Sequence, residues 1–173
     1  MKQNPLARNS MTKRFVAALF LMSLIFFGDI RTEARSGGDF TLEDQFGNEV
    51  AVKFPSNRPV VLVFGDREGS AQVEGWVRPV YGKYTDKLYI FGIAELSAVP
   101  WAAKPVVRRI IKSKSKNPIM LDWSGKVSKS YGCEKGKANV FVVSPAGKIT
   151  AVKRGAATGA ALKELYREID ALL

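Results

Sequence analysis

The sequence predicts an α/β protein in which a mixed central sheet carries helices on both faces and follows an N-terminal β-hairpin. Short apolar runs rich in β-branched residues alternate with segments of helical periodicity, a pattern typical of parallel strands joined by helices. Two alternating segments around a polar turn precede these units, and a strand pair and a helix end the chain. The composition, 46% hydrophobic and 25% charged, is that of a globular domain.

The hairpin is predicted from period-two alternation of apolar and polar residues. Phe40 and Leu42 precede the polar turn at 44–48, and Val50 and Val52 follow it. A Gly-Asn pair inside this turn favours a tight reversal of the chain.

Five further strands are expected. Residues 59–64 form a continuous apolar run, typical of a strand buried on both faces, and 88–93 is a second buried strand. Shorter strands are predicted at 119–121 and 140–143, and the turn after the latter returns the chain into 149–152. The helices between the first strands imply parallel pairing in the middle of the sheet, and the final hairpin adds an antiparallel edge.

Four segments have helical spacing. The first runs to Tyr84 from a cap at Asp66 or Ser70, a brief helix is expected at 127–131, and the last spans 158–172. The helix at 105–112 is expected to turn four apolar residues inward: Val106, Val107, Ile110 and Ile111.

Residues 1–34 have the pattern of an export signal. Lys13 and Arg14 precede an uncharged, mostly apolar segment at 15–27, which is short for a spanning helix, and Ala34 is a suitable last residue before cleavage. An uncleaved membrane anchor is the alternative, and Met11 is a second candidate start. We therefore expect a signal peptide or anchor at 1–34, a linker at 35–39 and one domain at 40–173. The protein is predicted to be exported, to the periplasm or another extracytoplasmic space.

The charge predicts anionic partners. The chain has 27 Lys and Arg against 16 Asp and Glu, a formal net charge of +11. For an exported protein this excess favours an envelope protein or an anionic surface over nucleic acid. Membrane attachment is expected only through an uncleaved leader, and the oligomeric state stays open.

Cysteine and histidine usage excludes several kinds of chemistry. Cys133 is the single cysteine, so the chain has neither a Cys-x-x-Cys motif nor an internal disulfide. The chain has no histidine, which removes His-ligated metal sites and His-dependent catalytic triads. We expect no metal and no cofactor.

Three segments carry a family resemblance: FTLEDQFGNEV at 40–50, MLDWSGKVSKSYGC at 120–133 and VFVVSPAGKI at 140–149. Together they resemble the thioredoxin-like redoxin superfamily, which includes peroxiredoxins and exported thiol oxidoreductases. The resemblance covers 40–172 and implies a thioredoxin-like fold. It also implies a Cys-x-x-Cys pair at the start of the first helix and a cis-proline facing that pair.

The chain departs from this family at both positions. Counting back from Pro79 places the cysteine pair at Ala71 and Glu74, whereas counting forward from the strand end places the first cysteine at Gly69. Ala138 stands at the position of the facing proline, and its preceding peptide bond is expected to be trans, because a cis bond before a non-proline residue is costly. Catalysis at this face is therefore not expected.

The preferred function is a non-catalytic binding module in the cell envelope. The alternative is a redoxin-type antioxidant or oxidoreductase that uses Cys133 with a partner thiol. In that alternative Lys135 and Lys137 lower the pKa of Cys133, whereas in the simpler interpretation Cys133 is a small buried hydrophobe.

Two clusters are candidate binding sites. Asp66 and Arg67 follow a buried strand, and with Glu74 and Arg78 they could hold a small polar group, although a solvated turn with surface ion pairs is the preferred interpretation.

The second cluster is basic and centres on Arg108, Arg109 and Lys112, with Lys114 and Lys116 beyond them. It could dock on an anionic surface, or it could complement the dipole at the C-terminus of a helix. Trp101, in the apolar loop before this helix, is expected to pack on the sheet, with partner contact as the alternative.

Overall fold

The structure, a computed structural model, describes residues 36–173, so the predicted leader and Arg35 lie outside the described residues. The elements in chain order are β1 (Phe40–Glu43), β2 (Glu49–Val52), β3 (Val60–Gly65), α2 (Ser70–Tyr84), η1 (Thr85–Lys87), β4 (Tyr89–Glu95), η2 (Trp101–Ala103), α3 (Lys104–Lys114), β5 (Ile119–Asp122), α4 (Lys126–Ser130), β6 (Asn139–Val143), β7 (Ile149–Arg154) and α5 (Gly159–Asp170). The helices and strands expected between residues 40 and 172 are all present.

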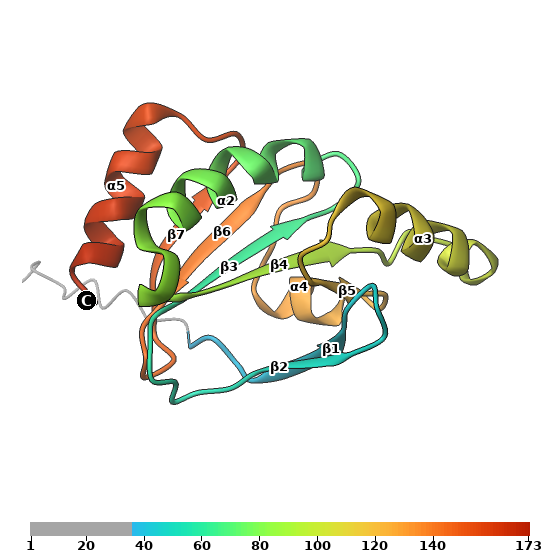
Figure 1. The fold of residues 1–173 in the computed structure, drawn as a ribbon, viewed down its shortest axis with the longest axis horizontal. Helices are drawn as coiled ribbons and strands as arrows, with labels where there is room; N and C mark the ends of the chain where they lie inside the picture. Colours follow the sequence, from blue (N-terminus) through green and yellow to red (C-terminus); the bar gives the residue numbers. More distant parts are fainter. Residues whose placement is uncertain (1–35) are drawn as a thin grey trace, which may run out of the picture. The chain divides into compact units, whose positions relative to one another are not determined.

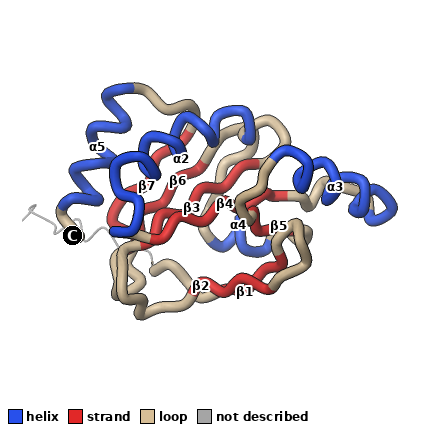
Figure 2. Tube along the Cα trace, in the orientation of Figure 1, coloured by secondary structure: helices blue, strands red, loops and turns tan. Residues whose placement is uncertain are grey.

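The central sheet has five strands in the order β5-β4-β3-β6-β7. The pairs β3–β4 and β4–β5 are parallel, and the pairs β3–β6 and β6–β7 are antiparallel. β1 and β2 form a separate antiparallel hairpin. The mixed sheet and the N-terminal hairpin are therefore confirmed (Figures 1 and 2).

The sheet is covered on both faces. Trp76 of α2 packs with Leu165 and Ile169 of α5 against one face. On the other face, the β1–β2 hairpin and α4 enclose a cluster that includes Phe64, Tyr131 and Phe141. Every residue of β3 is buried, as its continuous apolar run predicts. Figure 1 shows α2 and α5 on one side of the sheet and the hairpin with α4 on the other.

Two buried polar residues fix the hairpin turn to the edge of the sheet. The Oδ1 atom of Asp44 accepts hydrogen bonds from the backbone N–H groups of Phe46 (2.8 Å) and Asn48 (2.9 Å). Burial opposes ionisation of Asp44, but these bonds and that from the Asn48 side chain outweigh it and lower the pKa of Asp44. Gln45 accepts from the N–H of Ile119 (2.7 Å) and donates to the carbonyl of Asn117 (2.8 Å).

In α2, Val80 and Tyr84 are buried and Tyr81 is exposed. Burial in β4 differs from the sequence expectation. β4 was expected to be a buried strand, but only Ile93 is fully buried in it. α3, the helix after β4, contributes no buried residue.

The orientation of α3 is the main correction to the predicted fold. Val106 and Ile110 are exposed, and only Val107 and Ile111 lie on the half-buried side. Trp101, expected to pack on the sheet, is 82% exposed. The four apolar positions span an arc of about 140° around the helix, and the helix is turned so that only the Val107 and Ile111 edge of this arc faces the domain. No helix within residues 36–173 has both the length and the apolar character that crossing a bilayer requires.

Candidate functional site

The start of α2 is organised by Asp66. β3 ends at Gly65, and α2 begins at Ser70 after Gly69. The Oδ1 atom of Asp66 accepts a hydrogen bond from the N–H of Gly69 (2.7 Å), and its backbone carbonyl accepts one from Ser70 (2.9 Å). Asp66 thus satisfies two donors that the first turn of a helix leaves unpaired.

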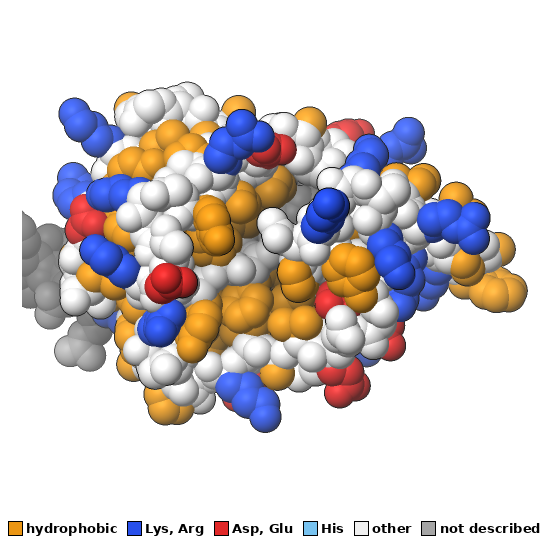
Figure 3. Space-filling view, viewed as in Figure 1, with side chains coloured by type: hydrophobic (Ala, Val, Ile, Leu, Met, Phe, Trp, Pro, Cys, Tyr) orange, Lys and Arg blue, Asp and Glu red, His pale blue; other side chains and the backbone are white. Residues whose placement is uncertain are grey.

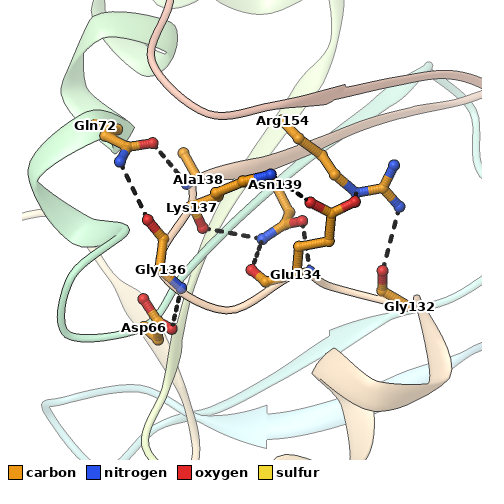
Figure 4. A network of polar contacts seen from close by, with 9 residues as sticks. All are labelled: Asp66, Gln72, Gly132, Glu134, Gly136, Lys137, Ala138, Asn139 and Arg154. Atoms are coloured by element: carbon orange, nitrogen blue, oxygen red, sulfur yellow. Dashed lines mark hydrogen bonds and ion pairs between the residues drawn. The ribbon is translucent and has the colours of Figure 1, made fainter.

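The loop at 134–138, which leads into β6, faces this helix start (Figure 4). The Oδ2 atom of Asp66 accepts from the N–H of Gly136 (2.7 Å). Gln72 donates through Nε2 to the carbonyl of Gly136 and accepts through Oε1 from the N–H of Ala138, both at 3.2 Å. Two side chains from the β3–α2 segment therefore bind the backbone of the facing loop.

Gly69 lies directly against that loop. A Cβ atom placed on Gly69 would be 2.3 Å from the carbonyl oxygen of Lys137 and 3.0 Å from the nitrogen of Ala138. The obstacle is backbone and not the flexible end of a side chain, so with the loop in this position residue 69 has room only for hydrogen. Gly69 is the residue to which the strand-end count assigned the first cysteine. The alternative positions, Ala71 and Glu74, are exposed farther along α2.

Asn139 holds the same loop from within. Its buried side chain donates to the carbonyls of Glu134 (2.9 Å) and Lys137 (3.0 Å) and accepts from the N–H of Glu134 (2.9 Å). The only cis peptide bond in residues 36–173 is Phe54–Pro55, so the bond before Ala138 is trans, as predicted.

An ion cluster closes the loop on the side of β7. Glu134 pairs with Lys137 (2.7 Å) and with Arg154 (3.2 Å), and Arg154 also donates to the carbonyl of Gly132 (3.2 Å). The hydrogen bond from Lys137, aided by the charge of Arg154, lowers the pKa of Glu134. In Figure 4 these side chains meet over the loop, so its polar groups are engaged from α2, β6 and β7 together.

Cys133 begins this loop but has the environment of a structural thiol. It is half-buried and packs against the cluster that contains Phe64 and Phe141. Burial raises the pKa of the Cys133 thiol from 9.0 to about 12, although Arg154 acts in the opposite direction. The expectation that Lys135 and Lys137 lower this pKa is therefore wrong.

The four polar residues proposed to grip a ligand do not converge. Asp66 is committed to the helix start and to Gly136, and Arg67 is exposed. Glu74 and Arg78 pair with each other one helical turn apart, with both side chains largely exposed. In residues 36–173 every buried side-chain polar atom has a hydrogen-bond partner within the protein.

The basic residues of α3 point in different directions. Arg108 binds Glu43 of β1 at 2.6 Å, and the ammonium of Lys112 lies 5.4 Å from the ring centre of Phe46. α3 ends at Lys114, so Lys116 lies outside the helix that carries Arg108 and Lys112. Arg109 is exposed and makes no ion pair with a described residue.

Sequence reasoning missed Gln72, Gly136 and Asn139, which carry most of the contacts between the loop and the rest of the domain. The role of Asn139 could have been predicted, because a polar residue at the start of a buried apolar strand requires hydrogen-bond partners. The roles of Gln72 and Gly136 could not, since their pairing depends on how closely the helix start approaches the loop.

Solved structures with the same fold include a thiol:disulfide interchange protein, a lipoprotein thioredoxin and a peroxidoxin. A putative thiol:disulfide interchange protein, DsbE, of Chlorobium tepidum matches with a TM-score of 0.60 and 18% identity over 80% of this chain and 96% of that one. The exposed lipoprotein thioredoxin of Streptococcus pneumoniae gives 0.62 and 18% over 76% and 99%. The peroxidoxin BcpB of Mycobacterium tuberculosis gives 0.58 and 18% over 80% and 96%.

No protein-family model and no curated protein matches the chain. The structural likenesses show that the chain has the thioredoxin-like fold, as its sequence predicts.

Proposed function

We propose that the protein is an exported thioredoxin-like module that binds a partner in the cell envelope and does no dithiol chemistry. The observation that carries the proposal is the contact between Gly69 and Lys137. A thiolate at a helix N-terminus needs a side chain there, and the carbonyl of Lys137 occupies the space that its Cβ would take.

The hydrogen bonds of the facing loop support the same proposal. A peptide substrate that added a strand beside this loop would need its free backbone groups. Gln72 already occupies the carbonyl of Gly136 and the N–H of Ala138, and Asn139 occupies the carbonyl of Lys137. A substrate would have to break these bonds before it could pair.

Export rests on the leader pattern at 1–34. One neighbour of the same fold is an exposed lipoprotein, which supports an extracytoplasmic location for this chain as well. Mass spectrometry of the protein from cell fractions tests this: an extracytoplasmic chain that begins at Arg35 is the expected result. A chain that stays in the cytoplasm with its leader intact would overturn the location.

The catalytic question is tested with purified protein in insulin-reduction and peroxide-consumption assays. We expect no turnover above buffer, for the wild type and for Cys133→Ala alike. A turnover that is present in the wild type and absent from Cys133→Ala would overturn the proposal and establish the one-cysteine alternative. A turnover that survives in Cys133→Ala would also overturn it, in favour of an activity that needs no thiol.

A further inference from the structure

α3 and the turn before it present apolar side chains to solvent. Trp101 is 82%, Val106 60% and Ile110 47% exposed, and no residue of α3 is buried. Single exposed apolar residues are ordinary on a protein surface, but three along one short segment indicate a contact surface.

The exposed apolar residues form a stripe with basic borders. Val106 and Ile110 are one helical turn apart, so their side chains lie on the same face. At 100° per residue, Arg109 lies on one side of this stripe and Lys114 on the other. Val107 and Ile111 occupy the half-buried side. α3 therefore has apolar side chains on its half-buried side and further apolar side chains that are exposed to solvent.

The charge of this segment has one sign. Residues 101–116 contain six Lys or Arg residues and no Asp or Glu. Three of the six are engaged within the domain: Lys104 lies 5.3 Å from the ring centre of Trp123, Arg108 binds Glu43, and Lys112 lies over Phe46. Arg109, Lys114 and Lys116 make no ion pair with any described residue. Figure 3 shows Lys and Arg side chains beside hydrophobic ones over α3, at the right of the view.

We infer that α3 docks on the surface of an anionic lipid bilayer, with Trp101, Val106 and Ile110 entering the boundary between headgroups and acyl chains. Arg109 and Lys114 would then contact the anionic headgroups on either side. This inference rests on the proposed envelope function and names its partner. It differs from the expectation that membrane attachment occurs only through an uncleaved leader.

Lipid fits this surface better than an acidic protein does. The stripe is formed by two side chains on one helical face, Val106 and Ile110, whereas each partner of a typical protein interface contributes about 800 Å². Tryptophan is enriched at the membrane–water boundary, and basic residues beside a shallow apolar stripe are the features of an interfacial helix. The apolar segment at 15–27, as signal or as anchor, brings the chain to a membrane during export.

The test reports on α3 separately from the leader. The full chain with Cys133→Ser carries an environment-sensitive fluorophore either at Val106→Cys or at Lys163→Cys. Lys163 is exposed on α5, which lies away from α3 in Figures 1 and 2. Vesicles are phosphatidylcholine alone or an equal mixture with phosphatidylglycerol. We expect a blue shift at position 106 with the mixed vesicles only, and none at position 163.

Charge variants set the magnitude. Arg109→Gln with Lys114→Gln is expected to weaken partitioning into the mixed vesicles about 25-fold, about fivefold for each charge. The matched pair Lys163→Gln with Arg167→Gln on α5 removes the same charge and should leave partitioning within about twofold. Trp101→Ser should also weaken it.

Three outcomes would overturn the inference: vesicle binding without a change at position 106, equal loss from the α3 and α5 charge pairs, or a shift at 106 that only an acidic protein produces. The insulin and peroxide assays are independent of all three. A failed docking with no turnover would leave the non-catalytic proposal standing, whereas turnover with successful docking would remove that proposal alone.

Discussion

The carbonyl oxygen of Lys137 sits 2.3 Å from the point that a Cβ atom of Gly69 would occupy. Real Cβ atoms do not approach another atom so closely, and the clash is with backbone, which gives way less easily than a side chain. The helix start and the facing loop therefore pack directly against each other, and this packing requires a glycine at position 69.

Gly69→Ala is expected to reduce the free energy of unfolding by about 1–3 kcal/mol, the usual cost of overpacking a tight site. Gly82→Ala is the matched control, because Gly82 lies in the same helix and no atom lies within 4 Å of its would-be Cβ. That variant should gain about 0.4–1 kcal/mol from a less flexible unfolded chain. Urea unfolding of the two variants beside the wild type measures both changes. Equal stability of Gly69→Ala and the wild type would show that the loop moves aside and that a cysteine could fit.

Asp66 is expected to stabilise the loop as well as the helix. Asp66→Ala leaves the N–H groups of Gly69 and Gly136 without their acceptor and should cost about 1–3 kcal/mol. Asp66→Asn keeps one acceptor oxygen but turns an amide donor toward the other N–H, so an intermediate loss is expected.

Amide hydrogen exchange of Gly136 distinguishes this role from simple helix capping. Its N–H should exchange faster in Asp66→Ala than in Glu74→Ala, a control that removes only an exposed ion pair on the same helix. Unchanged exchange of Gly136 in Asp66→Ala would contradict the contact to the loop.

The fold was predictable because its strands are strongly patterned. The continuous apolar run that became β3 and the alternation around residues 44–48 reflect burial that any packing of this chain must satisfy. The direction of α3 was not predictable in this way. Val106, Val107, Ile110 and Ile111 form one apolar arc about 140° wide, and periodicity alone does not tell which edge of this arc faces the domain.

The candidate site was only half predictable. The sequence alone shows that the chain has a single cysteine and that Ala138 stands at the position of the facing proline. Both observations predict that dithiol chemistry is absent. The close approach of the Lys137 carbonyl to Gly69 cannot be predicted from the sequence, because it depends on the distance between segments almost 70 residues apart. Likewise, Lys135 and Lys137 are near Cys133 in sequence, yet burial and not their charge determines the pKa of the thiol.

Gln45 is expected to fix the hairpin to the sheet edge. Gln45→Ala leaves the N–H of Ile119 and the carbonyls of Ser115 and Asn117 without their partner and should cost about 1–3 kcal/mol. Exposed Glu49 in the same hairpin gives a control, Glu49→Ala, which should change stability by no more than about 0.5 kcal/mol. Thermal unfolding measures both. A Gln45→Ala protein as stable as the control would show that solvent replaces these bonds.

Thiol labelling tests the environment of Cys133. At pH 8 a shift of its pKa from 9.0 to about 12 lowers the reactive thiolate fraction about 1,000-fold. Native protein should therefore react with an aromatic disulfide reagent far more slowly than protein in urea. Equal rates in the two states would contradict burial of the thiol and favour the one-cysteine redox alternative.

Alkaline stability should depend on Cys133 and Tyr131 together. Burial raises the pKa of Tyr131 from 10.0 to about 12, and that of Cys133 from 9.0 to about 12. Between pH 9 and 12 the unfolded chain therefore loses protons that the folded chain keeps, so the unfolded state binds fewer protons and the free energy of unfolding falls as pH rises. Below pH 9 both states keep these protons and the contribution is fully present.

Urea unfolding at a series of pH values measures the slope. Cys133→Ala should flatten it from pH 9 upward, and Tyr131→Phe from pH 10 upward, relative to the wild type. Surface lysines titrate in the same range, but they are common to all three proteins, so the difference between slopes isolates the two buried groups. A wild-type slope identical to that of Cys133→Ala would mean that the thiol ionises as freely in the folded protein as in the unfolded chain. The half-buried thiol beside the 134–138 loop would then be able to react, and the structural argument against redox chemistry would rest on the close contact at Gly69.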